Sequence, residues 1–324
     1  MSKCKHVFLT GLMLILTIIL TGWNDQVQSQ EKYPTGPIDI IVPVTPGGST
    51  DLSTRIIANL LRKKWGVPVN VVNKPGGNSV IGTLEVYRAA PNGYTMLGDN
   101  FAFVISGFYE KDLPFKILDR TFIYIHSEAP YLIAVPSNSP FKTLSDLTAE
   151  IKRNPEKIAY TSRGGGGVEF TVRQYYDAIG VDILKSKPVM SRGGSEAATL
   201  TAGGHVTFGA SSASSYGPSI SAGTVRPLLV TSKQRFPTVP DVPTATELGY
   251  PTITCTSWNG ISGPPNLPAH IAEVWNKALE EIVRNPEYVA QLKNAAMVPD
   301  YYNLQTTRKY VTQELEVANK LFSK

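Results

Sequence analysis

The sequence predicts an α/β protein with two domains, each built on a mixed or parallel sheet, and a ligand cleft between them. Apolar strands alternate with amphipathic helices over 38–98, which is typical of a parallel sheet with crossover helices. A second series of the same kind begins near 143. The stretch after 252 has too few predicted strands for a domain of its own, so we expect it to pack against the first sheet.

A glycine turn joins the first predicted strand, 38–44, to the first predicted helix, 50–65. Gly47 and Gly48 allow positive φ angles and let a ligand approach the backbone closely. Ser49 is expected to cap the helix. The remaining N–H groups, with the positive end of the helix dipole, favour an anion. We therefore expect this loop to hold a carboxylate.

Asp51 would repel such an anion and needs a separate explanation. In the first turn of the helix its charge stabilises the helix dipole, by about 0.3–1 kcal/mol. Binding of an ammonium or hydroxyl group of the ligand is the alternative, and we favour the helix role.

The rest of the first series follows from apolar periodicity and from breaks at glycine and proline. It is expected to contain strands at 67–73 and 94–98, a helix at 79–90, and strands at 121–126 and 131–136 that are separated by the small polar break 127–130. Because ligands bind at the carboxyl ends of parallel strands, the glycine turns at 46–48 and 74–78 lie at the expected ligand edge.

In the second series, Thr143 and Asp146 resemble a capping box at the start of a helix. The series is expected to contain helices at 144–153, 168–179 and 195–202 and strands at 158–162, 182–190, 205–210 and 225–231. The last segment is expected to contain a strand at 253–261 and helices at 268–284, 287–296 and 304–322. These elements predict domain 1 at 30–128 plus 253–324, with domain 2 inserted at 129–252. The chain is expected to cross between the domains near 127–131 and 252–260.

The first 29 residues have the pattern of a secretory signal peptide. Lys3 and Lys5 precede the almost entirely apolar stretch 7–20, which is shorter than the about 20 residues of a membrane span. Cleavage is expected after Ser29. A lipoprotein-like motif ends in Trp23 where the lipid-accepting cysteine would stand, so lipidation there is not possible. We expect a periplasmic or extracytoplasmic protein.

Composition excludes several classes of function. The formal charge of +5 is spread along the chain without a basic run, so nucleic-acid binding is not expected. The glycine turns lack the spacing of nucleotide-binding loops. Metal-ligand spacing is absent from the sequence, and we expect no metal and no cofactor.

Cys255 stands alone once the signal peptide is removed, so an intramolecular disulfide is not expected. A catalytic cysteine would need a base, and His126, His205 and His270 show no recognisable pairing with it. We interpret Cys255 as a small buried hydrophobic residue. The sequence offers no nucleophile–base set, so an enzyme is not expected.

Arg163 and Arg192 each stand beside glycine at the end of a predicted strand of the second domain. A guanidinium group can hold a carboxylate through two parallel hydrogen bonds, whereas the alternative is a solvated surface arginine. Serines 162, 195 and 211 could add neutral donors, although caps and turns are their commoner roles. Trp258, at the second crossing, could stack on a ligand ring or pack a hinge.

These features together resemble the Bug-type extracytoplasmic solute receptors of the tripartite tricarboxylate transporter system. The resemblance covers the whole mature chain. It is carried by Y-P-T-G-P-I-D-I-I-V-P, P-G-G-S-T-D, N-K-P-G-G-N, A-A-P-N-G-Y-T-M-L, T-A-G-G-H-V-T-F-G-A, A-G-T-V-R-P-L-L-V-T-S, F-P-T-V-P-D-V-P-T-A-T-E-L-G-Y and S-W-N-G-I-S-G-P-P, in this order.

The resemblance implies a type II periplasmic-binding-protein fold, or Venus flytrap, that closes on a small carboxylate without catalysis. Its partners would be the large and small membrane subunits of a tripartite transporter, and the receptor would be a monomer. Combining this with the residue arguments, the expected ligand-binding residues are Thr45, Pro46, Gly47, Gly48, Ser49, Thr50, Asp51, Ser162, Arg163, Gly164, Gly165, Gly166, Arg192, Ser211 and Trp258.

Two departures from the usual family pattern concern the arginines. Small polar residues are usual where Arg163 and Glu169 stand, and Tyr-Lys-Gly is usual near Arg192. Two arginines at the cleft suggest a ligand with two acidic groups. The alternatives are a ligand-loaded partner of a membrane sensor, which needs the same closure, and an exported enzyme that uses Cys255 or a serine.

Overall fold

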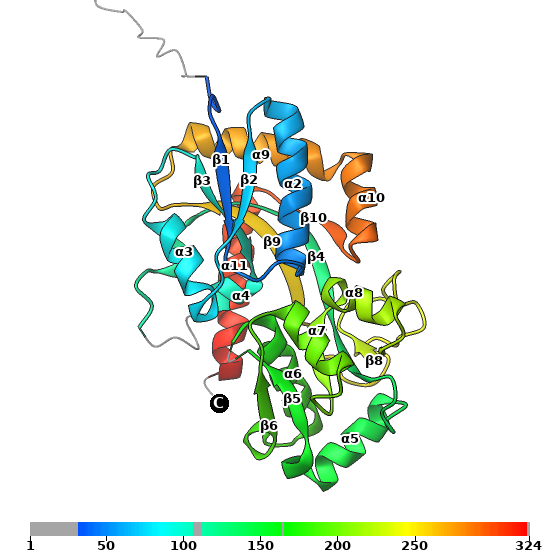
Figure 1. Ribbon diagram of the computed structural model, residues 1–324. Helices are drawn as coiled ribbons and strands as arrows, with labels where there is room; N and C mark the ends of the chain where they lie inside the picture. Colours follow the sequence, from blue (N-terminus) through cyan, green and yellow to red (C-terminus); the bar gives the residue numbers. More distant parts are fainter. Residues whose placement is uncertain (1–31, 106–111, 164, 323–324) are drawn as a thin grey trace, which may run out of the picture. The chain divides into compact units, whose positions relative to one another are not determined.

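The computed structural model describes residues 32–105, 112–163 and 165–322, and residues 34–324 form one compact unit. The predicted signal peptide, its cleavage site and Trp23 lie outside the described residues, as does Gly164. Helices and strands alternate through this unit, so the α/β prediction is confirmed (Figure 1).

The first sheet has the strand order β10-β4-β9-β3-β1-β2. Its strands are β1 (Ile38–Val42), β2 (Val69–Asn73), β3 (Thr95–Asn100), β4 (Thr121–Pro136), β9 (Thr256–Gly263) and β10 (Val298–Tyr302). As predicted, β1, β2 and β3 are parallel. The late strand β9 lies antiparallel between β3 and β4, so the C-terminal segment completes the first sheet.

The prediction of two separate strands at 121–136 is wrong, because β4 is a single strand of 16 residues. Its small polar stretch at 127–130 pairs with 256–259 of β9, which satisfies the backbone groups that would otherwise favour a break. Register shifts near Ile125 absorb the irregularity. The far half of β4 pairs with β7 (Gly209–Ser212) and β8 (Val225–Val230). One strand therefore serves both halves of the molecule (Figure 1).

The helices associated with the first sheet include the predicted first helix, α2 (Ser49–Trp65), which packs against β2 and β9. The others are α3 (Val80–Tyr87), α4 (Phe101–Val104), α9 (Ala269–Val283), α10 (Pro286–Asn294) and α11 (Leu304–Phe322). The predicted cap of α2 is wrong by one residue. Gly48 is the N-cap, and Ser49 is the first helical residue.

The second half contains the parallel pair β5 (Ala159–Ser162) and β6 (Lys187–Met190) beside β7 and β8. Its helices are α5 (Leu144–Arg153), α6 (Gly166–Ile179), α7 (Gly194–Ala202) and α8 (Ala213–Ser221). The capping box of Thr143 and Asp146 is confirmed. Strands β6 and β7 are shorter than, or shifted from, the predicted strands at 182–190 and 205–210. Helix α8 was not predicted because its start lies in the serine-rich run 211–215.

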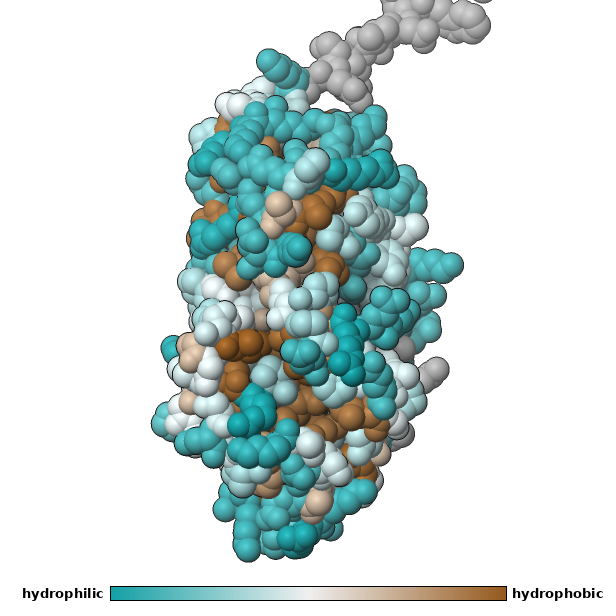
Figure 2. All heavy atoms as spheres, turned by 90° about the vertical axis from the view of Figure 1, so that its right-hand side faces the viewer, coloured by the Kyte–Doolittle hydropathy of each residue, from teal (hydrophilic) through white to brown (hydrophobic). Residues whose placement is uncertain are grey.

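Apolar side chains form several cores, and one of them joins the two halves, with Phe101 of α4 and Phe170 of α6 in the same cluster. In the second half, the rings of Tyr160, Tyr175, Tyr176 and Phe208 contact one another at the centre of one cluster. Burying such rings contributes about 1.5–3 kcal/mol each. On the face shown in Figure 2, apolar residues appear as separate patches within a mainly hydrophilic surface. No helix in the described part of the chain has the length and hydropathy to cross a membrane.

Candidate functional site

A small cavity lies where helix N-termini from both halves meet. Its volume is about 40 Å³. Five helices contribute residues from their first turns or caps: Gly48, Ser49 and Thr50 of α2, Asn100 and Ala102 of α4, Gly167 and Val168 of α6, Gly194 and Ser195 of α7 with Gly193 before it, and Ser212 and Ser215 of α8. Helix N-termini carry partial positive charge and outward N–H groups, so their convergence favours an anion.

Three of these helices begin without a side-chain cap. The N-cap residues of α2, α6 and α7 are Gly48, Gly165 and Gly193, which have no side chain to satisfy the first turn. By contrast, Asn100 caps α4 and Ser212 caps α8. Helix ends without caps leave backbone N–H groups without an acceptor, so a bound anion forms its strongest interactions there.

Arg163 supplies a full positive charge at the same cavity. Its side chain is buried, with 7% of the residue exposed, and it lines the cavity. Nη2 donates a hydrogen bond to Oγ of Ser79 at 2.6 Å. Burial lowers the pKa of the Arg163 guanidinium, an effect that Tyr131 opposes. No carboxylate among the described residues forms an ion pair with it.

The acidic residues near the cavity are each paired with another arginine. Asp51 pairs with Arg55, and Glu169 pairs with Arg173, both at 3.0 Å. In the same way, Glu196 pairs with Arg192. These pairs neutralise the first turns of α2, α6 and α7. Arg163 therefore remains as the uncompensated charge, and the site is cationic.

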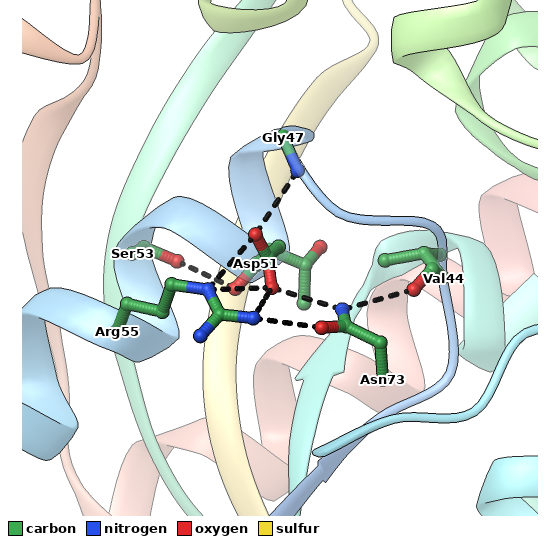
Figure 3. Close-up of polar contacts among 7 residues, drawn as sticks. Val44, Gly47, Asp51, Ser53, Arg55 and Asn73 are labelled. Carbon is green, nitrogen blue, oxygen red and sulfur yellow. Dashed lines mark hydrogen bonds and ion pairs between the residues drawn. The ribbon is translucent and has the colours of Figure 1, made fainter. Parts of the chain in front are cut away.

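Asp51 points into its own half of the molecule, where it fixes the loop (Figure 3). Its Oδ2 accepts from the backbone N–H of Gly47 at 3.0 Å, and its Oδ1 accepts from Nδ2 of Asn73 at 2.9 Å. The side chain is only 3% exposed. Asp51 thus holds the 45–48 loop in place and does not line the cavity.

Buried polar side chains form hydrogen bonds with the first two residues of α2. Asn100 Nδ2 donates to Thr50 Oγ1 at 2.5 Å, and Thr50 Oγ1 donates to Asn259 Oδ1 at 3.0 Å. Ser49 and Ser257 share a hydrogen bond of 3.1 Å. Buried hydrogen bonds of this kind fix side-chain positions. The cavity wall is therefore anchored to β9.

Cys255, the candidate nucleophile of the alternative enzyme hypothesis, lies in the interior. Cys255 is buried, and burial raises the pKa of its thiol. The prediction of a small buried residue at this position is confirmed. Within the described residues, no group of three or more histidine, cysteine, aspartate or glutamate side chains is arranged to hold a metal ion.

The family model of tripartite tricarboxylate transporter family receptors matches residues 53–324. The chain belongs to this family. BugT of Bordetella pertussis is 26% identical over 312 residues, which cover 95% of this chain and 95% of that protein. The solved periplasmic binding protein BugD is 26% identical, with a TM-score of 0.82, and the match covers 90% of this chain and 98% of BugD.

Two more distant structures share the fold. MatC of Rhodopseudomonas palustris, with bound malate, has a TM-score of 0.82 at 21% identity, covering 90% of this chain and 100% of MatC. R. palustris Rpa4515, with adipate, has a TM-score of 0.84 at 22% identity, covering 90% of this chain and 99% of that chain. The protein is therefore a solute-binding receptor of this family with the two-domain type II fold, while the exact domain bounds stay a prediction.

The structure brings together part of the predicted ligand set. The predicted residues that line the cavity are Thr45, Gly48, Ser49, Thr50 and Arg163. The predicted residues that do not line it are Pro46, Gly47, Asp51, Ser162, Gly165, Gly166, Arg192, Ser211 and Trp258. Gly164 lies outside the described residues.

Arg192 does not line this cavity. Its side chain is 80% exposed, and its Nε and Nη2 donate to Glu196. Ser162 instead donates to Glu169 at 2.5 Å, and Ser211 donates to the carbonyl of Gly194 at 2.8 Å. These contacts position α6 and α7.

Trp258 follows the second of the two interpretations given for it. It is 1% exposed and belongs to an apolar core with Phe101 and Phe170, so it packs the interior instead of meeting a ligand.

Several lining residues escaped the sequence interpretation, chiefly Asn100, Ala102, Tyr131, Gly167, Val168, Ser212, Ser215 and Ser257. Asn100 ends β3 beside β1, so the strand-end rule would have found it. Tyr131 and Ser257 lie within strands and carry no comparable signal.

Proposed function

We propose that the protein is an exported receptor that captures a small organic carboxylate and delivers it to a tripartite membrane transporter. The single observation that carries this proposal is Arg163, a buried cation without an acidic partner among the described residues at the cavity. Burying a charge is costly unless it is paired. A carboxylate would supply the missing partner.

The neutral groups of the cavity suit the same ligand. Ser195 Oγ is buried and has no hydrogen-bond partner within the described structure, so it is available to a ligand oxygen. Glycine N-caps at α2, α6 and α7 add backbone donors from both halves. The malate and adipate of the two R. palustris structures show that carboxylates suit this fold in those proteins.

One acidic group on the ligand is enough to explain the site. The idea of two acidic groups relied on Arg192, which is exposed and paired with Glu196. We therefore propose a carboxylate without requiring a second charge.

The test compares Arg163→Ala with Arg284→Ala by isothermal titration against malate, adipate, benzoate and hexanoate. We expect Arg163→Ala to weaken binding by about 10- to 100-fold, the worth of a hydrogen bond to a charged group. Arg284 is exposed, is paired with Glu280 and lines neither this cavity nor its neighbour, so Arg284→Ala is the matched control and should bind like wild type. Thermal unfolding without ligand checks that both variants fold. Equal affinity of Arg163→Ala and wild type for every bound acid would contradict the proposal.

Transport and signalling need the same capture step, so gene context separates them. A neighbouring gene for a multi-span permease would support delivery to the large and small membrane subunits. A neighbouring sensor kinase gene would favour the alternative role as the partner of a membrane sensor.

A further inference from the structure

A second, larger cavity adjoins the first at Arg163. Its volume is about 440 Å³, and Arg163 lines both cavities. The glycine turn at 75–79 forms one wall and the segment from Met190 to Arg192 forms the other. We call the cavity at the helix N-termini the inner chamber and this one the outer chamber.

The inner chamber is too small for the carbon chain of an elongated organic acid. A volume of about 40 Å³ has room for about three water molecules, which matches one carboxylate group. The carbon chain of a ligand held there must lie elsewhere. The outer chamber is adjacent to it and large enough.

Ser79 marks the boundary between the chambers. Its Oγ accepts the hydrogen bond from Arg163 and thereby fixes the guanidinium group between the two spaces. Asn78 and Ser79 have φ angles of 48° and 78°, which are uncommon for residues other than glycine. Strain of this kind persists where the surrounding structure requires it.

Apart from Arg163, which the acid group of the ligand would pair with, the outer chamber carries no unpaired charge and so suits an uncharged group. Its acidic residue, Glu196, is fully engaged with the side chain and the backbone N–H of Arg192. Pro75 and the exposed side chain of Met190 supply apolar wall. A neutral ion pair on an apolar surface gives little attraction to a second carboxylate and favours hydrocarbon.

We propose that the outer chamber binds the uncharged aliphatic or aromatic body of an elongated carboxylate whose acid group occupies the inner chamber. This specificity rests on the proposed function and extends it from a charged group to a class of ligand: monocarboxylates with an apolar body.

The test is a titration series with acetate, butyrate, hexanoate and adipate on wild type, Met190→Asp and Leu184→Asp. We expect affinity to rise about two- to fourfold for each added methylene from acetate to hexanoate in wild type. Met190→Asp should reduce hexanoate affinity at least fivefold and leave acetate unchanged. Leu184 is 83% exposed and lines neither chamber, so Leu184→Asp is the matched control and should bind like wild type.

The outcomes separate the two proposals. Acetate binding as tightly as hexanoate would overturn the outer chamber and leave carboxylate capture standing. Adipate binding at least tenfold tighter than hexanoate, with the gain lost in Arg192→Ala, would also overturn it, because the chamber would then bind a second acid. Failure of all four acids to bind, with a folded protein, would remove the proposed function itself.

Discussion

Arg163 and Arg192 look alike in the sequence, because each stands beside glycines at the end of a strand. The structure separates them by their neighbours. Arg192 has a glutamate four residues along the chain at Glu196, a spacing that favours an ion pair, and this was readable in advance. The partner of Arg163 is Ser79, which is 84 residues away, and no local rule predicts such a contact.

His126 gives a prediction at the same scale. Tyr288 donates its hydroxyl proton to the His126 carbonyl, so Nδ1–H of the ring donates to that hydroxyl, at 2.8 Å. Nε2 is buried and has no hydrogen-bond partner within the described structure. Burial lowers the pKa of His126 from 6.5 to about 3.

Since the unfolded chain binds a proton at His126 near pH 6.5 and the folded chain binds it only near pH 3, acid favours unfolding between these values. The histidine contribution to the free energy of unfolding should fall by about 1.4 kcal/mol per pH unit in this window. Urea unfolding of wild type and His126→Gln at several pH values measures it as a difference. Parallel pH profiles of the two proteins would contradict this assignment.

The comparison with His126→Gln is needed because Glu314 changes the free energy of unfolding with pH in the opposite direction. Burial raises its pKa to about 7, so its contribution to stability increases as the pH falls from about 7 toward its unfolded value of 4.5.

At the scale of elements, the sequence predicted helices and strands well where the apolar periodicity and the flanking glycine or proline residues indicated the same bounds. The start of α2, the capping box of α5 and the parallel trio β1, β2 and β3 depend on local pattern and lie close to their predicted places. The continuity of β4 and the existence of β10 depend on partners that are distant in sequence, and local pattern missed both.

The start of α6 gives the element-scale prediction. A Cβ atom on Gly167 would lie 2.2 Å from the buried Tyr131 hydroxyl, so Gly167→Ala forces a shift at the cavity. We expect a loss of about 1–3 kcal/mol in the free energy of unfolding, typical of overpacking. Gly217 in α8 has no atom of another element within 4 Å of its Cβ position, so Gly217→Ala is the matched control for packing. Because Pro218 follows it and disfavours a helical residue with a Cβ atom, we expect a small loss, well below that of Gly167→Ala. Urea unfolding measures both. Equal stability of the two variants would contradict the packing argument.

At the scale of the whole molecule, the sequence predicted an α/β fold with ligand loops at strand ends, because helix–strand alternation restricts the possible topologies. It did not predict the convergence of α2, α4, α6, α7 and α8 on one cavity, since that depends on how the two halves meet. The charge balance of the site follows from this convergence. Asp51, Glu169 and Glu196 are each paired with an arginine four residues away, and Arg163 is left without an acidic partner among the described residues.

The central claim is that this site binds its ligand through a carboxylate charge. Isothermal titration of benzoate and hexanoate against benzamide and hexanamide tests it most directly, because each pair differs in charge and little in shape. The account predicts that each acid binds at least tenfold tighter than its amide in wild type, and that Arg163→Ala removes most of this preference. Amides that bind as tightly as their acids would contradict it.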